Sequence, residues 1–133
     1  MTTLNGRILG QAERATRAVL DRLLARSGTT FEQWVAVNLT AAGPLTRDEL
    51  LAQMSAGLRT DPAGHVDAAF AAGLLTGDVA LTDLGRSRYE EISAGINAIA
   101  GQIYGDLSPE DLDTAGRVLL QVTARANAAL AAA

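Results

Sequence analysis

The chain has 133 residues, of which 48% are hydrophobic and 20% charged, and its 11 basic and 15 acidic residues give a net charge of -4. This composition is typical of a globular protein and excludes a disordered chain. The absence of cysteine excludes disulfides, thiolate metal sites and thiol catalysis. No apolar run approaches the roughly 20 residues that span a bilayer, and the N-terminus lacks a signal-peptide core, so we expect a cytoplasmic protein with no membrane partner.

Two amphipathic helices open the chain. Apolar residues recur at spacings of three and four over 5–26, which predicts a long first helix that ends at Gly28. Thr30 and Gln33 have the spacing of a capping box, which predicts the start of a second helix. Pro44 prevents that helix from continuing.

The next two predicted helices form a helix-turn-helix. Thr46 and Glu49 repeat the capping-box spacing, and the helix that they begin stops near Gly57. Asp61 followed by Pro62 is an N-cap with a proline at the first helical position, which predicts a fourth helix directly after the turn.

A short hairpin interrupts the helical sequence. The apolar segments 74–76 and 79–81 are strand-like, and Gly77-Asp78 between them suits a two-residue type II′ turn. Thr82 then caps a new helix. Helix, small hairpin and helix is the order of elements at the end of a winged helix.

Two further helices complete the chain. Isoleucines at 92, 96, 99 and 103 form a narrow seam, which favours a partner helix. Ser108-Pro109 begins the last helix, and its apolar face is expected to be buried. The residues of that face are Leu112, Ala115, Leu119, Val122 and Ala126.

Three short segments carry a resemblance to a known family. They are Pro44-Leu45-Thr46 before the third helix, Gly73-Leu74-Leu75 after the fourth, and Leu81-Thr82-Asp83-Leu84-Gly85-Arg86 after the hairpin. With the order of the elements, they make nearly the whole chain resemble the multiple antibiotic resistance regulator (MarR) family. The resemblance implies a mainly α fold with a small β-hairpin, in which a winged helix-turn-helix joins N- and C-terminal dimerisation helices.

The resemblance also implies an organisation and a function. It implies a single domain, 1–133, with a winged-helix DNA-binding lobe at 30–88 and a dimerisation lobe formed by 1–28 and 89–133. Such proteins are homodimeric transcriptional regulators whose fourth helix enters the major groove of double-stranded DNA, and small aromatic ligands often bind between the two parts. The family's hairpin is longer and carries an Asp-Arg pair that reaches the minor groove, whereas the shortened wing of this chain has only Gly77-Asp78 at its tip.

The candidate DNA contacts lie on the predicted helix-turn-helix and beside the hairpin. Between residues 46 and 88, four arginines stand against six acids, so we expect DNA binding that is weak or strongly salt-sensitive. Each candidate could instead be an ordinary solvated surface residue. The candidates are Arg47 on the third helix, Arg59 and Thr60 in the turn, His65 facing base edges, and Arg86 and Arg88, which could hold the DNA backbone beside the hairpin.

A candidate ligand site follows from the family layout. Trp34 and Asn38 lie one turn apart on the second helix, and Arg14 and Tyr89 could reach the same cleft. The competing interpretation places Trp34 in the core. The sequence does not identify a ligand.

No enzyme site emerges from the sequence. His65 is the one histidine and has no cysteine or nucleophile partner, and the paired acids stand near helix starts, where the helix dipole explains them. We therefore expect neither a catalytic site, a metal nor a cofactor. The alternative to a regulator is a helical dimerisation or protein-interaction module that keeps the winged-helix scaffold without binding an operator, which the shortened wing and the acidic balance favour.

Overall fold

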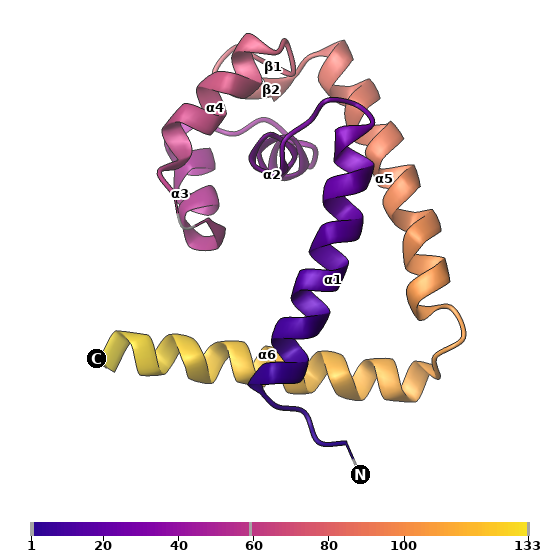
Figure 1. Ribbon diagram of the computed structural model, residues 1–133. Coiled ribbons are helices and arrows are strands. Elements are labelled where there is room, and N and C mark those ends of the chain that lie inside the picture. The colour runs from indigo at the N-terminus through magenta and orange to yellow at the C-terminus, as the bar shows by residue number, and fades with distance from the viewer. Residues whose placement is uncertain (1, 59, 133) are drawn as a thin grey trace. The chain divides into compact units, whose positions relative to one another are not determined.

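The computed structural model describes residues 2–58 and 60–132, and within them the chain forms six helices and one antiparallel hairpin (Figure 1). This confirms the predicted fold class. Two compact units, Met1–Asn97 and Ala98–Ala133, divide the chain. The elements are α1 (Gly6–Ala25), α2 (Phe31–Thr40), α3 (Arg47–Gly57), α4 (Pro62–Ala71), β1 (Leu75–Thr76), β2 (Ala80–Leu81), α5 (Asp83–Tyr104) and α6 (Pro109–Ala132).

Side-chain caps define the starts of the first helices. In α2, the Thr30 hydroxyl accepts a hydrogen bond from the Gln33 backbone at 3.1 Å, and the Gln33 side chain accepts one from the Thr30 backbone at 3.0 Å. Thr46 and Glu49 make the same reciprocal pair at α3. Asp61 caps α4. These caps satisfy backbone donors that have no partner within the helix, so the predicted starts of α2, α3 and α4 are confirmed.

Two buried apolar clusters hold the first unit together, and α2 contributes to both. Figure 1 shows α2 between α1 and the α3–α4 pair. The larger cluster joins α2, α3, α4 and the hairpin, and the smaller one joins α1, α2 and α5. The first contains Ala36, Leu50, Met54, Val66, Ala69, Leu75 and Val79, and the second contains Leu24, Trp34, Val37, Leu74 and Ile92.

The hairpin has a different register from the one predicted. Thr76 pairs with Ala80, so the loop has three residues and the predicted two-residue type II′ turn is wrong. A two-residue turn would place Val79 opposite the exposed Thr76 and on the same face. Instead Val79 is 1% exposed, and its carbonyl accepts a hydrogen bond from the Leu45 backbone at 3.0 Å. Burial of Val79 therefore favours the longer loop, and Gly77 begins it with a φ of 65°.

A tight corner joins the end of α4 to the start of α5. The Thr82 hydroxyl donates a hydrogen bond to the Gly73 carbonyl and accepts one from the Gly85 backbone at 2.9 Å. The Thr82 backbone donates to the Leu74 carbonyl at 3.1 Å. A Cβ at Gly85 would overlap that same carbonyl oxygen. The corner thus requires a threonine and, three residues later, a glycine.

The first half of α5 packs within its own unit. Ile92 is buried in the smaller cluster and Ile96 packs against it, while Gly95 faces Leu23 of α1. The prediction that the whole isoleucine seam seeks a partner helix is therefore wrong for this half. The reason is that α1 already supplies a facing helix.

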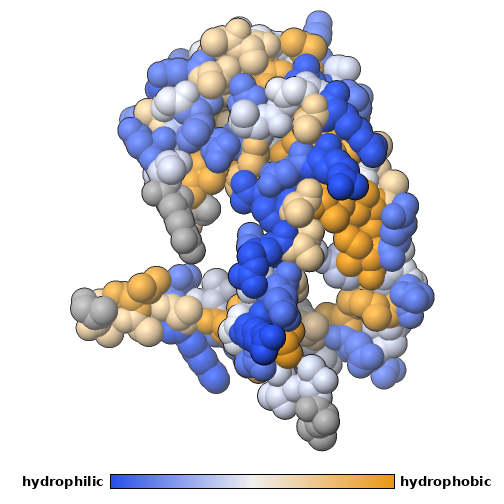
Figure 2. Space-filling view, in the orientation of Figure 1, coloured by the Kyte–Doolittle hydropathy of each residue, from blue (hydrophilic) through white to orange (hydrophobic). Residues whose placement is uncertain are grey.

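Helix α6 leaves its apolar side chains uncovered within the second unit. Ser108 accepts a hydrogen bond from the Asp111 backbone at 3.0 Å and caps the helix as predicted. No described residue of α6 is buried, contrary to the expected burial of Leu112, Ala115, Leu119, Val122 and Ala126. A unit of one helix and the end of another has no core to receive them. Figure 2 shows apolar side chains at the surface near the C-terminal end of α6, where Leu130 is 75% exposed.

In the described ranges, the helices lack the combination of length and apolar character that crossing a bilayer requires.

Candidate nucleic-acid interface and ligand groove

Helix α4 has one packed face and one open face. Pro62, Val66 and Ala69 are buried against the rest of the unit, whereas Gly64, Asp67, Ala68 and Ala71 are exposed. Three of the four exposed residues are glycine or alanine, so this face has no bulky side chain. Asp67 is its one charged group.

Arg47 lies beside this open face and forms an ion pair with it. Its Nη2 donates a hydrogen bond to Asp67 Oδ1 at 2.7 Å. Because Arg47 begins α3 and Asp67 lies in α4, the pair spans the helix-turn-helix. Both side chains remain open to solvent, at 42% and 68% exposure.

The turn before α4 holds two further predicted contacts. Thr60 Oγ1 and His65 Nε2 are 3.2 Å apart and share a hydrogen bond whose direction depends on the imidazole tautomer. His65 is half-buried rather than presented on the open face. Arg59 lies outside the described residues.

The two arginines after the hairpin have different surroundings. Arg88 is half-buried, and its Nη1 donates a hydrogen bond to the Thr29 hydroxyl at 2.8 Å. This bond joins α5 to the connection between α1 and α2. Arg86 is exposed, with its Cζ 6.0 Å from the Tyr89 ring centroid. Of the two, Arg86 is the one presented to solvent.

The four predicted ligand residues do not share one cleft. Trp34 stacks on Tyr89 with ring centroids 5.8 Å apart and an angle of 17° between the rings. Trp34 is only 7% exposed and belongs to the smaller core cluster, as the competing interpretation expected. Asn38 is exposed, and Arg14 lies on the open side of α1, where it folds back over Gly10.

Arg14 instead lines an open groove of about 760 Å³. The groove lies between the N-terminal half of α1, the start of α2 and the segment from α3 to α4. A volume of this order suits a small organic ligand. The lining residues are Gly6, Leu9, Gly10, Glu13, Arg14, Arg17, Phe31, Glu32, Leu58 and Thr60.

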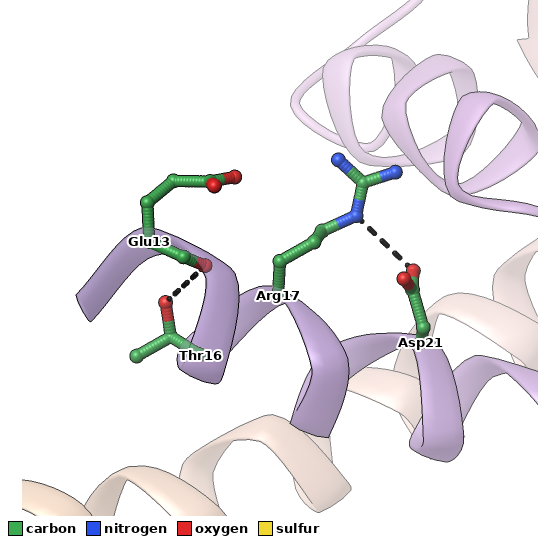
Figure 3. A network of polar contacts seen from close by, with 4 residues as sticks. All are labelled: Glu13, Thr16, Arg17 and Asp21. Atoms are coloured by element: carbon green, nitrogen blue, oxygen red, sulfur yellow. Dashed lines mark hydrogen bonds and ion pairs between the residues drawn. The ribbon is translucent and has the colours of Figure 1, made fainter. Parts of the chain in front are cut away.

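Arg17 and Phe31 line the groove beside α2. Arg17 Cζ lies 3.4 Å from the Phe31 ring centroid, which is a close cation–π contact. Arg17 Nε also donates a hydrogen bond to Asp21 Oδ1 at 3.1 Å (Figure 3). The hydroxyl of the adjacent residue, Thr16, donates a hydrogen bond to the Glu13 carbonyl at 3.2 Å. Phe31 was missed from the sequence because its apolar character fits the packed face of α2 equally well.

Residues 2–58 and 60–132 contain no group of three His, Asp or Glu side chains close enough together to hold a metal ion.

No protein-family model and no curated protein matches the chain. Solved structures do. Ligand-free NadR is 25% identical with a TM-score of 0.74, and NadR in complex with 4-hydroxyphenylacetate is 27% identical with a TM-score of 0.71; each match covers 90% of this chain and 95% of NadR. A MarR-family transcriptional regulator from Rhodococcus sp. RHA1 is 19% identical, with a TM-score of 0.71 over 88% of this chain and 89% of that chain. The chain has the winged-helix fold of these structures.

The MarR-type fold extends to a third protein with a bound ligand. CouR from Rhodococcus jostii RHA1, solved with p-coumaroyl-CoA, is 17% identical, with a TM-score of 0.73 over 88% of this chain and 90% of CouR. A MarR-family transcriptional regulator from Silicibacter pomeroyi shares this fold, at 19% identity and a TM-score of 0.62. The helix-turn-helix of the fold corresponds here to α3 and α4, and its wing to the β1–β2 hairpin.

Proposed function

We propose that the chain is a homodimeric transcriptional regulator that binds double-stranded DNA through α3 and α4. The observation that carries this proposal is the open face of α4, where Gly64, Ala68 and Ala71 leave the helix without bulky side chains. An α-helix with its side chains is about 10–12 Å wide, and the major groove is about 12 Å wide. Such a helix can therefore lie deep in the groove with its backbone close to the base edges.

The charge of the lobe determines how this binding depends on salt. Residues 46–88 carry a net charge of -2, so the few arginines must supply the phosphate contacts. Binding should be readily detected near about 50 mM salt and fade steeply by about 200 mM.

The test is a selection of duplexes from a random pool by the purified protein at low salt, followed by fluorescence anisotropy with the selected duplex. Gly64→Glu adds a carboxylate at the N-terminal end of the open face, and Gly64→Ala is its matched control. A Cβ at Gly64 meets nothing within 4 Å, so both variants should fold. The glutamate variant should lose binding and the alanine variant should keep it. The proposal would be contradicted if the unmodified protein retained no duplex.

A second function is favoured by specific contacts in the same lobe. The wing tip carries Asp78, Arg88 is engaged with Thr29, and Asp67 is the one charge of the open face. These features suit a dimerisation or protein-interaction module that has kept the scaffold. The selection experiment separates the two, since this module would retain no duplex even at low salt.

We also propose that the groove beside α1 binds a small anionic aromatic molecule that controls DNA binding. Leu9, Phe31 and Leu58 can cover an aromatic ring, while Arg14 can bind a carboxylate. The structures of NadR with 4-hydroxyphenylacetate and of CouR with p-coumaroyl-CoA support this ligand class. Thr60 lines the groove and bonds His65 of α4, so an occupant would contact the segment that positions α4.

A further inference from the structure

The ion pair between Arg47 and Asp67 joins two helices at the edge of the open face of α4. The guanidinium Nη2 and the carboxylate Oδ1 are 2.7 Å apart, and the two residues are 20 positions apart in sequence. Asp67 is the one carboxylate of α4. It therefore places a negative charge on the face that this helix would present to DNA.

Fold stability gives little reason for this pair. Arg47 is the first residue of α3, where a positive charge opposes the helix dipole. An ion pair with both side chains open to solvent contributes little, because water screens it and both side chains lose rotamer freedom. Asp67 would also weaken DNA binding by itself, since its charge repels phosphates.

A different role follows from the geometry of the guanidinium. Arginine has five N–H donors in a rigid plane, and the bond from Nη2 to Asp67 limits the directions in which the others point. A fixed arginine meets a phosphate oxygen or a base edge only when the DNA lies in one register. An unfixed arginine follows phosphates in any register and so binds all DNA alike.

We propose that Asp67 is a positioning residue that holds Arg47 for one contact with the operator and thereby raises the preference for the operator over other DNA. The proposal rests on the DNA binding proposed above. In the operator complex, Arg47 contacts the DNA with its remaining donors and still neutralises Asp67. In any other register, the acid stays close to phosphates and weakens the complex.

The test compares Asp67→Asn with Asp78→Asn, which removes the same charge from the wing tip without touching Arg47. The probes are the selected duplex and a scrambled duplex of equal length, at fixed salt. Asp67→Asn should bind the scrambled duplex more tightly but the selected duplex no better, so the ratio of the two affinities should fall by about tenfold. Asp78→Asn should leave the ratio unchanged. Both residues are exposed, so both variants should keep their unfolding transition.

A double-mutant cycle with Arg47→Ala adds a readout that a surface charge alone would not move. In the Arg47→Ala background, Asp67→Asn should strengthen binding to both duplexes by the same factor, because there is no arginine left to position. If Asp67→Asn in the native background strengthened binding to the selected and scrambled duplexes by the same factor, the role of the pair would be overturned, whereas the DNA-binding proposal would stand. Failure of the unmodified protein to retain any duplex would overturn both.

Discussion

The carbonyl oxygen of Leu74 occupies the space in which a side chain on Gly85 would begin. This close approach lies where the hairpin meets α5, and the Thr82 hydrogen bonds fix it from the other side. Gly85 is buried, so neither chain segment can move outward without opening the smaller core cluster.

Gly85→Ala should therefore lower the free energy of unfolding by about 1–3 kcal/mol or more, because the group that must move is backbone. Gly101→Ala on the same helix is the control. Its Cβ would meet nothing within 4 Å, and it should be neutral or raise stability by up to about 1 kcal/mol. Urea unfolding measures both variants. Equal stability of the two would show that the corner can yield.

The capping carboxylate of α3 makes the stability of the fold depend on pH. Hydrogen bonds from the Thr46 backbone and then from its side chain lower the pKa of the Glu49 carboxyl below the usual value of 4.5. A lowered pKa in the folded state stabilises the fold above the usual pKa, and this contribution is lost as the pH falls through the lowered value.

Glu49→Gln keeps the capping geometry without a titrating group, so the stability advantage of the native chain at pH 7 should shrink below about pH 4.5. The cap of α2 offers the reverse change. Gln33→Glu should introduce a similar loss of stability at acid pH. Unfolding curves from pH 7 to pH 3 measure both, and a difference between Glu49→Gln and the native chain that stays constant with pH would contradict the assignment.

Ligand binding can be tested with 4-hydroxyphenylacetate as the probe. Arg14→Gln should weaken its binding by about tenfold, the loss expected for one charge-assisted hydrogen bond in a partly exposed site. Arg22→Gln on the same helix is the control, because Arg22 does not line the groove. Isothermal titration calorimetry measures both. Equal affinities of the two variants for the probe would show that the ligand does not bind in the groove.

Dimer formation is best tested on α6. Leu119 and Leu130 are three turns apart on one face, and neither is buried in the single chain. Glutamate at both positions should give a monomer by light scattering while the first unit keeps its unfolding transition. Gln121→Glu on the opposite face should leave the dimer intact. A stable monomer of the unmodified chain at micromolar concentration would contradict the proposal.

Short-range signals predicted the fold well. The pairs Thr30–Gln33 and Thr46–Glu49 act across three residues, so their spacing alone determined where α2 and α3 begin. The hairpin register depended instead on burial of Val79 among residues of α2, α3 and α4. The local turn preference of Gly77-Asp78 could not reveal that packing.

The candidate site was less predictable, since its parts come from distant segments. The groove joins residues of α1 to Leu58 and Thr60, and no sequence period links them. The Arg47–Asp67 pair depends on how α3 and α4 pack. Trp34 shows a different difficulty, because a lone tryptophan in a sequence is compatible with both a binding site and a core. Its stacking on Tyr89 becomes visible only in the structure.

The hydroxyl group of Thr82 has a mechanical consequence. It donates a hydrogen bond to the Gly73 carbonyl, which lies just after α4, and accepts one from the Gly85 backbone in the first turn of α5. These two hydrogen bonds restrict movement of the first turn of α5 relative to the end of α4. The Thr82 oxygen thus links α5 directly to the end of α4, the helix that we propose contacts DNA.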